Sequence, residues 1–142
     1  MDVKLYEKLH EVFDPLADIF KPASDEDRKI MAKYRRTDEE KVIKRIRQQG
    51  AYQNDDGMWS CDGDVDISSM KLTKIPVRFK KVDGNFNCCK NQLTTLEYCP
   101  KEVGGNFDCK SNKLTSLKGS PEKVGGNFYC YENQLTTLEG SP

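Results

Sequence analysis

The chain has 142 residues, the size of one domain or of a small domain joined to a short repeat array. Charged residues make up 32% of it, Lys and Arg balance Asp and Glu at 23 each, and the mean hydropathy is −0.78. This balance gives no global attraction to nucleic acid or to a membrane surface, and no apolar run reaches the length of about 18 residues that a membrane-spanning helix needs. We therefore expect a soluble protein with no membrane partner. Residues 1–20 carry acidic side chains and do not resemble a secretory signal peptide.

Residues 1–50 place apolar side chains at helical spacings and predict a helical N-terminal region. Residues 14–15 (Asp-Pro) and Pro22 interrupt the first stretch. One helix is predicted from Ser24 to about Tyr34. A separate helix is predicted to begin at the capping box of residues 37–40, to bury Val42, Ile43 and Ile46, and to stop at Gly50.

The second half of this region is basic between residues 28 and 47. Such a run can bind nucleic acid or an acidic partner, but it more often forms the solvated face of a helix. We keep nucleic-acid binding as an alternative and not as the leading expectation. The candidate basic patch consists of Arg28, Lys33, Arg35, Arg36, Lys44 and Arg47.

Residues 51–61 contain a strong turn signal, Asn54-Asp55-Asp56-Gly57, between Tyr52 and Trp59. We expect a small hairpin here that leads into the next segment and covers its exposed edge.

Residues 62–142 follow a 21-residue period. Apolar and asparagine positions recur on this grid, and such a period is typical of a leucine-rich-repeat solenoid. The predicted fold is therefore α+β: a helical N-terminal region (1–50), a hairpin connector (51–61) and a solenoid (62–142) with one atypical cap unit (62–81) and three full units. The recurring positions are Val82, Val103 and Val124; Phe86, Phe107 and Phe128; Cys88, Cys109 and Cys130; Asn91, Asn112 and Asn133; and Leu93, Leu114 and Leu135.

Within a unit, Phe107 and Cys109 alternate with Asp108, which predicts a short strand with one buried face that pairs in parallel with its neighbours. Asn112 is expected to satisfy backbone groups where the chain leaves the strand, so that stacked units form an asparagine ladder. Prolines such as Pro121 suit the return segment, and Gly104-Gly105 suits a tight corner into the next strand.

The six cysteines are predicted to be reduced, and those of the repeat to pack in the core as small hydrophobes. A zinc site and a redox role for Cys89, expected to be the more exposed member of the Cys88-Cys89 pair, are less favoured alternatives, as is weak cation binding by Asp62, Asp64 and Asp66. His10 is the only histidine, so acid–base catalysis has no obvious residues. We predict no enzymatic activity, no cofactor and no metal.

The outward strand positions differ from unit to unit, and function is expected there. They grade from acidic through polar to aromatic, and tyrosine is common at protein interfaces. The predicted partner-binding residues are Asp64, Asp66, Asn87, Asp108, Lys110, Tyr129 and Tyr131.

The unit VGGNFDCKSNKLTSLKGSPEK and the lead-in DGMWSCDGDVDISS resemble the leucine-rich-repeat proteins encoded by tailed bacteriophages, over roughly residues 50–142. A more distant likeness is to the repeats of secreted bacterial effectors. The resemblance implies a phage protein in the host bacterial cytoplasm, and fold more than activity. The leading expectation is a non-enzymatic accessory protein that binds, and in one version inhibits, a host, defence or phage protein through the concave strand face and the open end of the last repeat. The alternatives are a virion or assembly component that oligomerises through that end, with a homodimer as one form, and the nucleic-acid binder above.

Overall fold

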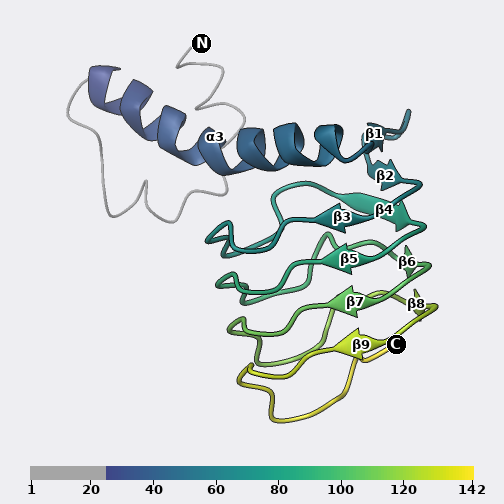
Figure 1. The fold of residues 1–142 in the computed structure, drawn as a ribbon. Coiled ribbons are helices and arrows are strands. Elements are labelled where there is room, and N and C mark those ends of the chain that lie inside the picture. Colours follow the sequence, from purple (N-terminus) through teal and green to yellow (C-terminus); the bar gives the residue numbers. More distant parts are fainter. Residues whose placement is uncertain (1–24) are drawn as a thin grey trace. The chain divides into compact units, whose positions relative to one another are not determined.

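The computed structural model describes residues 25–142, without the side chains of residues 27, 28 and 30–37 (Figure 1). The predictions for the first stretch of the N-terminal region, and His10, lie outside these residues. The chain divides into two compact units, residues 1–38 and residues 39–142. All packing described below belongs to the second unit.

Helix α3 (Asp25–Gln48) is continuous, so the predicted separation into two helices near Thr37 is wrong. No proline or glycine lies between its ends, and strong helix formers such as Arg, Lys, Glu and Ala flank Thr37 on both sides. A capping box signals a helix start only where the preceding residues cannot themselves be helical. The residues before Thr37 can be helical, and α3 therefore continues through the capping box.

The predicted stop of α3 at Gly50 is confirmed, and it is a Schellman motif. Gly50 has φ +96°, its N–H donates to the carbonyl of Arg47 (3.1 Å), and the N–H of Ala51 donates to that of Ile46 (2.9 Å). Ala51 and Ile46 are both buried, as this motif favours. The stripe predicted on this helix is also found: Val42 and Ile46 are fully buried in the same core as Val65, with Ile43 packed against it.

Strands β1 (Tyr52–Gln53) and β2 (Trp59–Cys61) pair antiparallel and form a hairpin. Its turn is built by Asn54: the backbone N–H donates to the Met58 carbonyl (2.7 Å), and Nδ2 donates to the same carbonyl (3.0 Å). Gly57 takes the left-handed conformation, φ +84°.

Two sheets, parallel throughout the repeat units, stack these units at a 21-residue offset, so that the chain after α3 forms a β-solenoid and the fold is α+β as predicted (Figure 1). The four-stranded sheet has the order β3-β5-β7-β9, and register pairs Val65 with Phe86 and Phe86 with Phe107. Its strands are β3 (Val65–Asp66), β5 (Phe86–Asn87), β7 (Phe107–Asp108) and β9 (Phe128–Tyr129).

The other sheet, with the order β1-β2-β4-β6-β8, places a second strand in each repeat that the sequence did not predict. The residues on either side of β6 and β8 do not alternate between apolar and polar, so no period-2 signal marks these strands. They are β4 (Phe79–Val82), β6 (Glu102–Val103) and β8 (Lys123–Val124).

A column of stacked aromatic rings runs through the core of the solenoid. Phe86 and Phe107 stack at 5.6 Å between ring centroids, and Phe107 and Phe128 at 5.2 Å, with planes within 10° of parallel. The first unit has the smaller Val65 at this position, and Phe79 fills the space by meeting Phe86 edge-on at 5.1 Å and 76°.

The predicted asparagine ladder is confirmed. Nδ2 of Asn112 donates to the carbonyls of Cys88 and Cys109, each at 3.0 Å, and its Oδ1 accepts from the N–H of Leu93 (3.0 Å). Asn91 and Asn133 repeat the pattern one unit earlier and later. Each side chain thus satisfies backbone groups of two units where the strands end.

A second ladder, not predicted, runs along the start of the strands. Oδ1 of Asp64 accepts a hydrogen bond from the backbone N–H of Asn85 (2.8 Å). In the same way Oδ1 of Asn85 accepts from the N–H of Asn106, and Oδ1 of Asn106 from the N–H of Asn127, both at 2.7 Å. The signal was present, because asparagine recurs there on the 21-residue grid. The ladder also explains a neighbouring glycine: none of the corner glycines has positive φ, but a Cβ on Gly105 would collide with Oδ1 of Asn85, a member of the ladder in the preceding unit.

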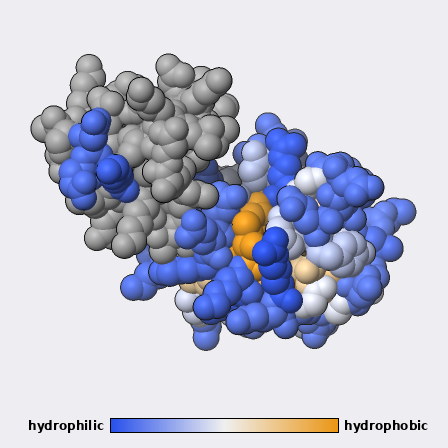
Figure 2. Space-filling model, turned by 90° about the horizontal axis from the view of Figure 1, so that it is seen from above, coloured by the Kyte–Doolittle hydropathy of each residue, from blue (hydrophilic) through white to orange (hydrophobic). Residues whose placement is uncertain are grey.

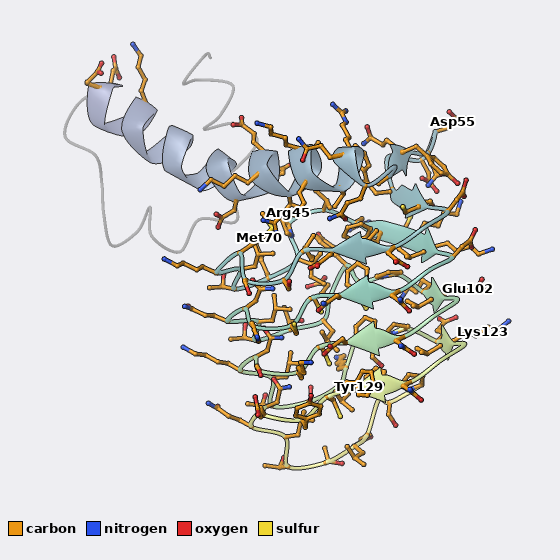
Figure 3. All side chains as sticks on the ribbon, in the orientation of Figure 1. Arg45, Asp55, Met70, Glu102, Lys123 and Tyr129 are labelled. Atoms are coloured by element: carbon orange, nitrogen blue, oxygen red, sulfur yellow. The ribbon has the colours of Figure 1, made fainter. Side chains whose placement is uncertain are left out.

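Side chains from the end of α3 close the free edge of β3. Gln49 donates from Nε2 to the carbonyl of Asp66 (3.0 Å) and accepts its N–H at Oε1 (2.9 Å), as a further strand would. Arg45 donates to the carbonyl of Ser68 (3.1 Å), and it lies next to the loop of Met70 in Figure 3. The edge of β3 is therefore covered against further strand pairing.

Seen from above, the coloured surface is mainly hydrophilic, with one small apolar area (Figure 2).

Candidate partner-binding face

The outward side of the four-stranded sheet carries two columns in which neighbouring units differ. We call these eight residues the variable face. The first column is Asp66, Asn87, Asp108 and Tyr129, and the second is Ser68, Cys89, Lys110 and Tyr131. Strand alternation turns these positions away from the core, and all of them except the buried Cys89 are at least partly exposed. The structure thus brings onto one surface the predicted residues Asp66, Asn87, Asp108, Lys110, Tyr129 and Tyr131.

Three members of the first column also have a local structural role. In each, Oδ1 accepts a hydrogen bond from the backbone N–H of the residue two positions later. The pairs are Asp66 with Ser68 (2.9 Å), Asn87 with Cys89 (3.0 Å) and Asp108 with Lys110 (3.1 Å). These Asx turns hold the backbone as it leaves each strand and use only Oδ1 of each side chain. Tyr129 cannot make this bond, so the fourth unit departs from the pattern.

Tyr129 and Tyr131 form the centre of what we call the tyrosine cluster, with Asn127, Asp108 and Lys110. The two rings meet edge-on at 6.5 Å and 86°. Nδ2 of Asn127 donates to the Tyr129 hydroxyl (2.9 Å), a contact that sequence reasoning did not predict. Tyr129 is 36% exposed and Tyr131 54%, so the cluster presents aromatic surface to solvent.

Lys110 lies between an acid and a ring in this cluster. Its Nζ is 3.3 Å from Oδ2 of Asp108 and 5.7 Å from the centroid of the Tyr131 ring. The hydrogen bond to Asp108, and then that to Tyr131, raise the pKa of Lys110. The cluster therefore favours a positive charge.

Asp64 lies at the acidic end of the same sheet but in the second ladder, where one of its oxygens holds the N–H of Asn85. Asp64 and Asp66 are exposed, and neither makes an ion pair with the described residues. Within the part of the chain that the structure describes, no group of three or more His, Cys, Asp or Glu side chains is arranged to hold a metal ion.

The cysteines pack as predicted: all six are free, and Cys88 and Cys109 are completely buried. Burial raises the pKa of Cys88 and Cys109 and raises that of Cys99 to about 12, so the fold favours the protonated thiol at these positions over the nucleophilic thiolate. Cys89 is more exposed than Cys88, as expected, but only at 6%, and desolvation raises its pKa too.

The candidate basic patch lies on α3. Lys44 and Arg47 are exposed, and the Arg47 guanidinium lies 5.3 Å from the centroid of the Trp59 ring. The side chains of Arg28, Lys33, Arg35 and Arg36 lie outside the described residues, so their part in a patch stays a prediction. No helix in the described part of the chain has the length and apolar composition to cross a membrane.

Comparisons with protein-family models, with curated proteins and with solved structures returned no match for this chain.

Proposed function

We propose that this chain is a non-enzymatic protein–protein interaction module whose variable face binds another protein. The observation that carries the proposal is the contrast on one sheet: the inward positions repeat, whereas the outward positions diverge and end in two exposed tyrosines. Exposed tyrosines give rigid amphipathic contact area, and a few such residues contribute most of the energy of a typical interface.

The phage leucine-rich-repeat resemblance belongs to the same proposal. It rests on the motifs of residues 50–142 quoted above, and the repeating solenoid is compatible with it. On this basis we propose a phage accessory protein that acts in the host bacterial cytoplasm on a host, defence or phage protein.

The test is affinity capture from bacterial lysate with the tagged chain. The face variant carries Tyr129→Asn and Tyr131→Ser, which place asparagine and serine where Asn87 and Ser68 stand in other units. We expect a protein retained by the unmodified chain and absent with the face variant. A matched control, Thr94→Ala, changes an exposed residue outside the variable face and should retain it. Equal retention by both variants would contradict the proposal.

Self-association is the second candidate, and the last unit favours it. Strands β8 and β9 end their sheets, Phe128 and Cys130 are half-buried, and Leu138 is 64% exposed. An uncovered sheet edge with apolar neighbours can pair with a second copy. Light scattering of the 142-residue chain tests this: a concentration-dependent dimer that Leu138→Lys weakens supports it, and a monomer at every concentration contradicts it.

A further inference from the structure

The tyrosine cluster shows which chemistry the variable face accepts. Its one cation, Lys110, already lies over the Tyr131 ring and against the Asp108 carboxylate. Tyrosine rings attract cations through the negative charge of their faces, more strongly where water is excluded. A partner that covered this cluster would therefore meet groups that stabilise positive charge.

The acidic side chains at the other end of the same sheet also attract positive charge. The Asp64 and Asp66 carboxylates are exposed and make no ion pair with a described residue, whereas Lys110 is neutralised by Asp108. Tyr131 is more than half exposed, so one ring remains accessible beside the bound Lys110. The face thus offers carboxylate oxygens at one end and aromatic rings at the other, and both prefer lysine or arginine.

We infer that the partner of the variable face is a polypeptide segment with basic side chains, extended across the units. This rests on the proposed function and specifies its partner. One basic side chain would contact Tyr129 and Tyr131, and another would pair with Asp66 and Asp64.

The spacing of these two sites limits the segment. They are three unit steps apart, and parallel strands lie about 4.8 Å from each other, so the separation is about 14 Å. An extended chain advances about 3.3 Å per residue, so the two basic residues should be about four positions apart.

The experiment measures fluorescence anisotropy of labelled peptides with the full chain. The first peptide has two arginines four positions apart in a Gly/Ser background, the second has glutamates at those positions, and the third has adjacent arginines. We expect the spaced arginine peptide to bind most tightly and to weaken as salt rises.

The protein variants copy residues that other units already carry at the same position, so they should fold. Asp66→Asn copies Asn87, and Tyr131→Ser copies Ser68. Each should weaken the spaced arginine peptide about three- to fivefold, the range expected for an exposed cation–aromatic or ion-pair contact. Lys90→Ser, which copies Ser69 and Ser111 and removes an exposed cation next to Cys89, should leave the affinity equal or higher.

Arginine and glutamate peptides that bind equally, or an affinity unchanged in both Asp66→Asn and Tyr131→Ser, would overturn the inference. If in that case the face variant still loses its lysate partner, the interaction function stands and only the basic character of the segment is wrong. If the lysate partner is kept as well, both proposals fail.

Discussion

The inward columns and the variable face lie on opposite sides of the same two-residue strands, yet only the inward side repeats. In a parallel, in-register stack each side chain lies about 4.8 Å from its equivalent in the next unit. A column can repeat only a residue that packs favourably against itself. Phe86, Phe107 and Phe128 do so by ring stacking, and Asn91, Asn112 and Asn133 by bonding the backbone of two units. Repetition therefore indicates residues that pack on their own kind, and divergence indicates positions where stacking does not require one residue type.

Charged side chains test this rule because like charges on neighbouring strands repel each other. In the other sheet, register aligns Lys81 with Glu102 and Glu102 with Lys123, so the sign alternates from unit to unit. Figure 3 shows Glu102 and Lys123 on adjacent units, on the side of the solenoid away from Met70. Opposite charges on neighbouring strands stabilise a sheet, and like charges destabilise it.

The largest effect should come from breaking a repeated column. Asn112→Ala leaves the buried N–H of Leu93 without an acceptor, and it removes one of the two amide donors from each of the carbonyls of Cys88 and Cys109. We expect the free energy of unfolding to fall by about 3 kcal/mol, measured by urea denaturation. Asn133→Ala, in the same column but only half-buried, should lose less. Equal losses would show that burial does not set the strength of the ladder.

A smaller loss is expected where units approach each other closely. A Cβ on Gly84 would lie 2.7 Å from the carbonyl carbon and oxygen of Gly63, whereas a Cβ on Gly63 meets nothing within 4 Å. Both occupy the same column. Gly84→Ala should lower the free energy of unfolding by about 2 kcal/mol, and Gly63→Ala should change it by less than about 0.5 kcal/mol. Paired thermal melts of the two variants measure the difference, and identical melting temperatures would contradict the close stacking.

Reversing the middle charge of the alternating column should have a weaker effect. Glu102→Lys places three lysines on adjacent strands, and we expect a loss of about 1 kcal/mol that shrinks as salt is added. Glu102→Gln, which removes the attraction without adding repulsion, should lose less. The two variants are compared by denaturant titration at low and high salt, and a salt-independent loss would mean that repulsion is not its cause.

The variable face should show the smallest effect on stability. Tyr129→Asn and Tyr131→Ser together should change the free energy of unfolding by about 0.5 kcal/mol or less, because both rings are exposed and other units carry these residues. A large loss in the same denaturation assay would assign the tyrosines to the fold and not to a partner.

The sequence alone determined the solenoid, because a 21-residue period with buried Phe, Cys and Leu positions has few other physical solutions. It also predicted the asparagine ladder and the packing of the repeat cysteines, which follow from the 21-residue period, and the stop of α3 at Gly50, which depends on local sequence. It placed the variable face correctly through strand alternation, from Asp66 to Tyr131.

Only the tertiary structure decided the features that depend on contact between units. The second strand of each repeat, the Asp64–Asn85 ladder and the closing of the β3 edge by Gln49 arise between segments that lie 17 residues or more apart in the chain. The continuity of α3 has a different cause, because the helix propagates through the capping box of residues 37–40 without any contact between units. The contact of Lys110 with Asp108 and Tyr131 belongs here too, because charge and ring come from different units and meet only when the units stack.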